Sequence, residues 1–170
     1  MTEPLLILVD QNDREIGQMN KLEAHEKGIL HRAISVLIFD TKGNWLLQKR
    51  ASTKYHSPSL WSNTCCSHPS PGENTSEAAK RRLIEEMGLE VELKYAFNFT
   101  YKTGFSNGLI EHELDHVFVG ITDTLPLINK DEADDFKYVA QDRLLININQ
   151  NPEKYSEWFK ILVPKIIEQL

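Results

Sequence analysis

Residues 72–89, GENTSEAAKRRLIEEMGL, predict a loop, a helix with clear ends and a second loop. Asn74 is a preferred capping residue, and Glu77 completes the capping pattern three positions later. Gly88 is suited to end the helix, because glycine takes a left-handed backbone at little cost. The pattern therefore predicts a helix over residues 77–87.

Short strands are predicted on both sides of this helix. Their pattern favours strands at 4–10, 31–40, 45–50, 91–101 and 111–121, with a hairpin turn at 41–44 and a loop at 51–60. One or two helical turns are predicted at 20–26. The C-terminal third is expected to be helical from about Pro152, with Pro164 kinking or dividing it. Strands and helices without strict alternation indicate the α+β class.

Length and composition indicate one ordinary globular domain over residues 1–170. The chain is 41% hydrophobic and 26% charged, with a net charge of −6. This charge argues against nucleic acid or an anionic membrane as a partner. The apolar runs are too short to span a bilayer. The two cysteines are adjacent and poorly placed to bridge each other, which favours a reducing, cytoplasmic location.

The segment Asn63–Pro69, NTCCSHP, places a thiol two residues from an imidazole. If the segment is extended, Cys66 and His68 share a face and Cys65 points the other way. A thiol beside a metal-binding or proton-carrying imidazole suits catalysis. The alternative is a buried cysteine and a surface histidine that merely lie close.

Residues 67–89 resemble the Nudix box, a loop–helix–loop motif that holds divalent metal against a diphosphate. Ser67 stands where the box opens with glycine, and Arg82 replaces an acidic residue. Nudix hydrolases use the full set of helix carboxylates to bind metal and activate water. The loss of one of them therefore argues against a hydrolase. We interpret Glu85 as a solvated helix residue and retain Glu86 as functional. The matching residues are Glu73, Arg81, Leu83, Glu85, Glu86, Gly88 and Leu89.

Three further motifs resemble those of one Nudix-fold family, the type I isopentenyl-diphosphate isomerases. They are Cys-x-His-Pro after Asn63, the upstream pair His25 and His31, and the strand motif Glu111-His-Glu113. The resemblance runs from about residue 5 to residue 158. It implies a single-domain Nudix-type fold with a mixed β-sheet flanked by helices. It also implies interconversion of isopentenyl and dimethylallyl diphosphate.

The resemblance implies a metal site of three imidazoles and two carboxylates. Such a set suits a first-row divalent ion, Mn, Fe or Zn. Residues two apart on a strand face the same side, so both glutamates can contribute. Taken singly, each histidine is more often a surface or core-edge residue, and we expect His56, His112 and His116 to be structural. The implied ligands are His25, His31, His68, Glu111 and Glu113.

The implied reaction protonates an unactivated alkene and removes a proton elsewhere, which requires an acid and a base. Cys66 and Glu113 are the predicted pair, with Tyr101 hydrogen-bonded nearby. Trp158, and more weakly Trp61, would lie beside the carbocation. The alternative for both tryptophans is core packing.

The substrate is then a small allylic or homoallylic diphosphate, held by a basic cluster and by Mg²⁺ at Glu86. A Nudix hydrolase and a non-catalytic metal-binding protein remain alternatives. We expect a monomer or a weak homodimer. The predicted substrate-binding residues are Lys21, Arg50, Lys54 and Arg82.

Overall fold

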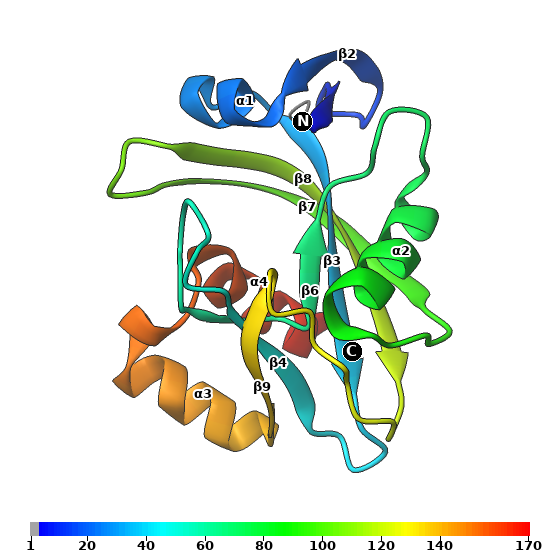
Figure 1. Ribbon diagram of the computed structural model, residues 1–170, viewed down its shortest axis with the longest axis vertical. Helices are drawn as coiled ribbons and strands as arrows, with labels where there is room; N and C mark the ends of the chain where they lie inside the picture. Colours follow the sequence, from blue (N-terminus) through cyan, green and yellow to red (C-terminus); the bar gives the residue numbers. More distant parts are fainter. Residues whose placement is uncertain (1–3) are drawn as a thin grey trace.

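A mixed nine-stranded sheet forms the centre of the molecule in the computed structural model, which describes residues 4–170 (Figure 1). The strands are β1 Leu5–Val9, β2 Glu15–Asn20, β3 His31–Phe39, β4 Trp45–Arg50, β5 Trp61–Ser62, β6 Cys65–Ser67, β7 Lys94–Gly104, β8 Ile110–Ile121 and β9 Ala133–Val139. The helices are α1 Lys21–Lys27, α2 Thr75–Met87, α3 Gln141–Gln150 and α4 Glu157–Gln169, with a 3₁₀ turn at Pro152–Lys154.

Strand β3 organises the sheet because it pairs on both edges. It runs parallel to β8 over its whole length and antiparallel to β1, β4 and β6 at successive positions. Nearly all of β3 is buried, as expected for a strand covered on both faces. The pairing with β4 spans only two residue pairs near the hairpin turn, which leaves room for β6 farther along.

The two faces of β3 carry different cores. Ile34, Val36 and Ile38 pack with α2 through residues such as Leu83 and Met87. Leu37, on the other face, belongs to the cluster formed largely by α4. Side chains of a strand alternate between faces, so the sheet separates an α2 layer from an α4 layer. The α+β, mixed-sheet prediction is confirmed.

The predicted helix at 77–87 is confirmed, and its ends follow from the sequence. Asn74 Oδ1 accepts a hydrogen bond of 2.8 Å from the Glu77 amide, and Glu77 Oε1 accepts one of 3.0 Å from Asn74 Nδ2. Gly88 ends the helix at φ 62°. A Cβ atom there would lie 2.6 Å from the Leu127 carbonyl oxygen, so only glycine fits.

The C-terminal part differs from its prediction. Strand β9 and helix α3 precede residue 152, where no regular element was expected. The β9 sequence alternates weakly and is stabilised by its pairing with β4. Pro164 lies inside α4 without dividing it, because Leu162, Val163 and Ile166 are buried in the core and hold the helix together. None of the helices in residues 4–170 is long and apolar enough to cross a membrane.

Candidate active site

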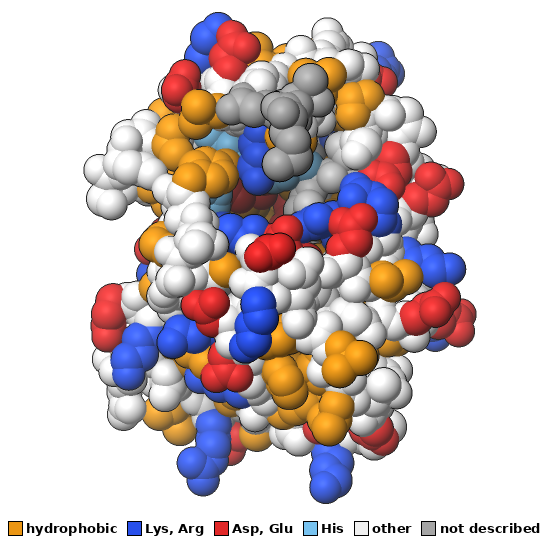
Figure 2. All heavy atoms as spheres, viewed as in Figure 1, with side chains coloured by type: hydrophobic (Ala, Val, Ile, Leu, Met, Phe, Trp, Pro, Cys, Tyr) orange, Lys and Arg blue, Asp and Glu red, His pale blue; other side chains and the backbone are white. Residues whose placement is uncertain are grey.

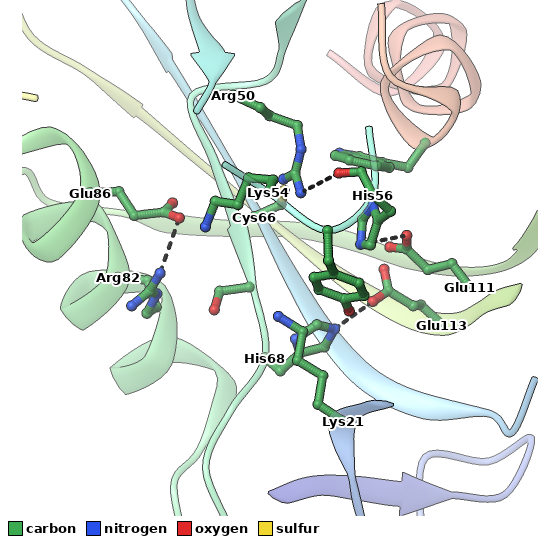
Figure 3. Close-up of a pocket in the computed structure, with 13 residues that line it drawn as sticks. Lys21, Arg50, Lys54, His56, Cys66, His68, Arg82, Glu86, Glu111 and Glu113 are labelled. Carbon is green, nitrogen blue, oxygen red and sulfur yellow. Dashed lines mark hydrogen bonds and ion pairs between the residues drawn. The ribbon is translucent and has the colours of Figure 1, made fainter. Parts of the chain in front are cut away.

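A narrow pocket of about 60 Å³ opens where β6, β8, α2 and the loop at 51–60 meet (Figure 3). We call it the central pocket. It collects most of the site residues predicted from sequence. Figure 2 shows a hollow on this face, bordered by charged side chains and with histidine surface inside it. The lining residues are Lys21, Arg50, Lys54, Tyr55, His56, Cys66, Ser67, His68, Arg82, Glu86, Glu111, Glu113 and Trp158.

Strand register brings the buried residues of the site together. Cys66 lies opposite Ser35, and Glu113 lies between His31 on β3 and Tyr101 on β7. Residues paired across neighbouring strands project from the same face of a sheet. Side chains that are far apart in the sequence therefore converge on the α4 face.

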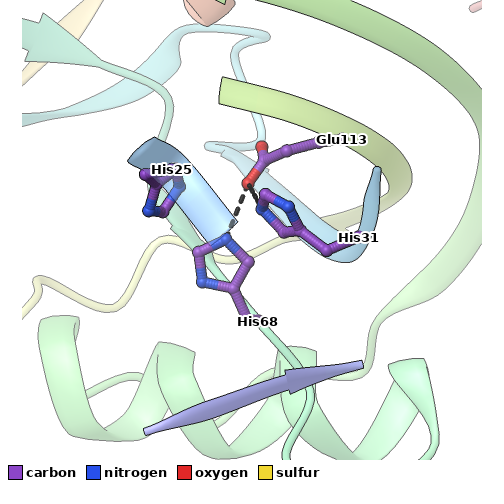
Figure 4. Close-up of side chains that lie close together, drawn as sticks. All are labelled: His25, His31, His68 and Glu113. Atoms are coloured by element: carbon purple, nitrogen blue, oxygen red, sulfur yellow. Dashed lines mark hydrogen bonds and ion pairs between the residues drawn. The ribbon is translucent and has the colours of Figure 1, made fainter. Parts of the chain in front are cut away.

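Four of these side chains form a compact group of potential metal ligands (Figure 4). One ligand atom each from His25, His31, His68 and Glu113 lies within 4.8 Å of all the others. Glu113 Oε2 is 3.2 Å from His31 Nε2 and 2.6 Å from His68 Nε2. His25 Nε2 is buried without a hydrogen-bond partner among the described residues.

The hydrogen bonding of His31 favours a cation in this group. His31 Nδ1 lies 2.9 Å from the Ile29 carbonyl oxygen, which only accepts, so Nδ1 carries the proton. In the neutral ring, Nε2 is then an acceptor that faces a second acceptor, Glu113 Oε2. Two such acceptors need a proton or a metal ion between them. Three imidazoles and a carboxylate fit a first-row divalent ion.

The protonation states of the histidines also suit metal binding. Burial, with the neighbouring His68 and His31, lowers the pKa of His25 to about 3. Burial lowers the pKa of His68 to about 4, although its hydrogen bond with Glu113 opposes the shift. Both rings are neutral near pH 7, and a neutral imidazole nitrogen is the form that binds metal.

Glu111, Tyr101 and Glu113 share hydrogen bonds deep in the site. The Tyr101 hydroxyl lies 2.6 Å from Glu111 Oε1 and also contacts Glu113 Oε1. The hydroxyl has a single proton, so it donates a hydrogen bond to only one of the two carboxyl groups at a time. Burial and the nearby Glu113 raise the pKa of Glu111 well above its usual range. Burial alone would raise the pKa of Glu113 too, but hydrogen bonds with His31 and His68 hold that pKa well below its usual range. Glu113 is therefore the ionised member.

Cys66 lies in the central pocket on the same face as this chain of hydrogen bonds. Burial is the main reason that the pKa of its thiol is raised, and the nearby Glu86, Glu111 and Glu113 carboxylates add to it. The thiol consequently keeps its proton near neutral pH. A protonated thiol and an ionised carboxylate facing one pocket are the two groups that acid–base catalysis requires.

Cations gather at the α2 end of the central pocket. Arg82 Nη2 lies 3.1 Å from Glu86 Oε1 and 3.2 Å from Glu132 Oε1, and Lys54 also contacts Glu132. Burial disfavours the charge of Arg82, but Glu86 and Glu132 outweigh it and raise its pKa. Glu86 Oε2 is buried without a hydrogen-bond partner in the described part of the chain.

Arg50 and Lys21 approach the pocket from other elements. Arg50 donates through Nη2 to the His56 carbonyl and through Nε to the Ser57 carbonyl, each at 3.2 Å. Its guanidinium carbon lies 4.9 Å from the centroid of the Trp158 ring. Lys21, the first residue of α1, places Nζ 5.3 Å from the centroid of Tyr55 at the pocket mouth.

Comparison with known proteins places the chain in a family. A family model described as the NUDIX domain matches residues 29–159. Isopentenyl-diphosphate Delta-isomerase 2 of Aromatoleum aromaticum is 52% identical over 97% of this chain and 87% of that protein. The isopentenyl-diphosphate Delta-isomerase of Pectobacterium atrosepticum is 52% identical over 95% of this chain and 90% of that protein. This chain belongs to the isopentenyl-diphosphate Delta-isomerase family, within the Nudix domain proteins.

Solved structures support the same fold. A crystal structure from Deinococcus radiodurans has a TM-score of 0.80 at 18% identity and covers 95% of this chain and 98% of its own. A MutT Nudix hydrolase from Burkholderia pseudomallei has a TM-score of 0.64 at 19% identity, covering 83% and 98%. At these identities the likeness concerns the fold alone, and membership of the isomerase family rests on the sequence relatives.

Four of the five metal ligands implied by the family resemblance lie together. The four-residue group includes His25, His31, His68 and Glu113. Glu111 is instead hydrogen-bonded to Tyr101, and its Oε2 atom is buried without a hydrogen-bond partner among residues 4–170. Its role as a ligand stays a prediction.

The two tryptophans considered for the site differ in position. Trp158 lines the central pocket. Trp61 is not among the residues that line this pocket, and Lys137 Nζ lies 4.2 Å from the centroid of its ring. His56, which we expected to be structural, lines the pocket and lies 4.0 Å from Glu111. Its sequence neighbours form an irregular loop, in which the sequence gives no regular pattern that would predict the direction of the ring. His112 points away from the site, toward the Gly28 carbonyl, as predicted.

The Nudix-like box has a consistent internal structure despite its two departures. Glu73 accepts hydrogen bonds of 2.8 and 2.9 Å from Arg81, which tie the loop to α2. Glu85 is exposed, as predicted, and Glu86 is buried. Cys65 points into the α2 core, as its alternation with Cys66 predicted. It also lies beside Glu86, which with burial raises the pKa of its thiol, so it is less isolated from the site than expected.

Proposed function

We propose that this chain interconverts isopentenyl diphosphate and dimethylallyl diphosphate, with residues 1–170 acting as one catalytic domain. The observation that supports it best is the central pocket itself. A protonated thiol, Cys66, and an ionised carboxylate, Glu113, line it together with Arg82, Lys54 and Glu86. The pocket thus offers an acid and a base for the hydrocarbon and cations for the diphosphate, in a chain about half identical to named isomerases.

In the forward direction Cys66 would give its proton to the terminal CH₂ carbon of the alkene. The positive charge then lies on the tertiary carbon, and Glu113 would remove a proton from the carbon on its other side. One proton is gained and one is lost, so substrate and product are isomers. Tyr101, which contacts both carboxyl groups, would hold Glu113 in place. Once the product has left, the proton on Glu113 would be released to solvent and the Cys66 thiolate would take one up, which restores the starting state. Positioned proton transfer contributes about 10²–10⁴-fold to a rate.

Trp158 would stabilise the carbocation by its ring face. It lines the central pocket and is 2% exposed, so its ring is largely shielded from water. A desolvated cation over an aromatic ring gains about 2 kcal/mol. The same shielding would keep water from trapping the cation as an alcohol.

His25, His31, His68 and Glu113 would hold one Mn²⁺, Zn²⁺ or Fe²⁺ ion, with Glu111 at its edge. The ion would supply a fixed positive charge that keeps Glu113 ionised and in place. Glu86 would hold Mg²⁺ through its free oxygen, and Lys21, Arg50, Lys54 and Arg82 would bind the diphosphate oxygens. Arginine suits this task because its fork matches phosphate geometry.

The test is incubation of the purified, metal-loaded protein with Mg²⁺ and isopentenyl diphosphate. We expect an acid-labile allylic diphosphate. Recovery of unchanged substrate, with the metal content verified, would overturn the proposal. Release of inorganic phosphate would favour a Nudix hydrolase, which the Arg82–Glu86 ion pair in place of a second carboxylate argues against.

A further inference from the structure

We propose that His56, stacked on Phe105, is the wall that limits the length of the hydrocarbon which the central pocket accepts. The inference rests on the proposed function, because it assumes that a diphosphate-bearing alkene occupies this pocket.

Three of the four predicted diphosphate-binding residues mark one end of the pocket, whereas the fourth, Arg50, lies over Trp158. A second cavity of about 240 Å³ adjoins the central pocket, and the two share Lys21, Lys54 and Arg82. Opposite charges attract most strongly where both are partly removed from water, so the diphosphate belongs at this cationic end. The hydrocarbon must then extend toward the opposite end.

His56 closes that opposite end. Figure 3 places it across the pocket from Glu86 and Arg82. Its ring is stacked on Phe105 with centroids 4.6 Å apart and an angle of 10°, and it meets Trp158 edge-on at 5.7 Å. The side chain is buried, with 8% of the residue exposed. The stacked ring therefore presents an aromatic surface to the pocket.

Space exists directly behind this wall. A groove of about 530 Å³ lies between the 55–60 loop and the tip of the β7–β8 hairpin, lined by residues 104–107 on the hairpin side. His56 and Tyr55 line both this groove and the central pocket. Residues that line two cavities lie between them, so loss of the His56 ring would join the two.

The backbone behind the ring is held independently of it. Arg50 donates to the carbonyls of His56 and Ser57, and Asn107 donates to the Tyr55 carbonyl at 3.1 Å. Truncation of the His56 side chain therefore removes the wall and leaves the loop anchored. A closely packed wall discriminates by about 1–3 kcal/mol for each methylene that does not fit.

The experiment measures chain-length preference in wild type, His56→Ala and His56→Phe. The substrates are isopentenyl diphosphate and analogues in which propyl or pentyl replaces the methyl branch. The measured quantity is kcat/KM for each analogue divided by kcat/KM for isopentenyl diphosphate. We expect this ratio to rise at least about tenfold in His56→Ala and to stay near wild type in His56→Phe, since phenylalanine preserves the wall without the imidazole.

Binding supplies a readout that needs no turnover. Calorimetry with saturated 3-methylbutyl diphosphate and its propyl- and pentyl-branched analogues should show the same selective gain in His56→Ala. Phe105→Ala opens the wall from the hairpin side and replaces His56→Ala if that variant fails to fold. An unchanged length preference in the alanine variant would overturn the inference. So would a gain for the longer analogues in His56→Phe as large as that in His56→Ala. Inactivity of wild type on isopentenyl diphosphate would instead overturn the proposed function, and the binding series would still test the wall.

Discussion

At the cationic end of the central pocket an ion pair is formed within one helix, whereas at the hydrocarbon end the paired residues come from different strands. Arg82 and Glu86 lie one turn apart on α2 and contact each other directly. His31 and Glu113 are 82 positions apart and meet through the pairing of β3 with β8. The Arg82 side chain is 18% exposed, while His31 is fully buried. A buried polar group cannot replace a lost partner with water. Truncation of a side chain at the hydrocarbon end should therefore have the larger effect.

The largest effect is expected from Cys66→Ala, which removes the proposed acid. We expect kcat to fall by at least about 100-fold, in the range found for positioned proton transfer. Metal content and the circular dichroism spectrum should match wild type. Cys65→Ala, one residue away on the α2 face, is the matched control. A Cys66→Ala enzyme with wild-type kcat would remove the thiol from the mechanism.

His68→Ala should remove the transition metal, because it takes away one member of the four-residue group and a hydrogen bond of Glu113. Elemental analysis of the purified variant measures this directly. His112→Ala is the control, since that ring faces the Gly28 carbonyl and not the group. Equal metal content in both variants would show that the ion binds elsewhere.

Arg82→Ala tests the cationic end and should mainly weaken substrate binding. A hydrogen bond to a charged group contributes about 1.5–3 kcal/mol, so KM should rise roughly 10- to 100-fold. The change in kcat should be much smaller than for Cys66→Ala. Lys80→Ala removes one positive charge from the exposed face of the same helix and should leave KM near wild type. A fall in kcat with unchanged KM would contradict the division between the two ends.

The smallest effect is expected from Cys65→Ser. Cys65 is 1% exposed within the α2 core, so a hydroxyl there meets apolar groups as well as the neighbouring Glu86 carboxyl. A cost of about 1 kcal/mol would lower the melting temperature by roughly 2–4 °C. Thermal unfolding measures this, with Cys65→Ala as the apolar control. Equal melting temperatures for Ser and Ala would show that the hydroxyl finds a partner.

Local features of the molecule were predictable from sequence. The ends of α2 follow from Asn74, Glu77 and Gly88, because capping and left-handed backbone depend on near neighbours. Alternation along β6 and β8 predicted that Cys66 shares a face with His68, and Glu111 with Glu113. Strand β9 was not predictable, because its stability comes from pairing with β4 rather than from its own pattern.

By itself the sequence determined the fold class, the isomerase family and most residues of the site, since its motifs consist of neighbouring residues whose spacing is set by the chain. Only the tertiary structure decided that Glu113, and not Glu111, is the ionised carboxylate, and that His56 stands in the pocket wall. Both results depend on burial and on partners from distant strands and loops. Burial changes the pKa of a carboxyl group, and a partner such as His68 or Arg50 acts only once the fold brings it within contact.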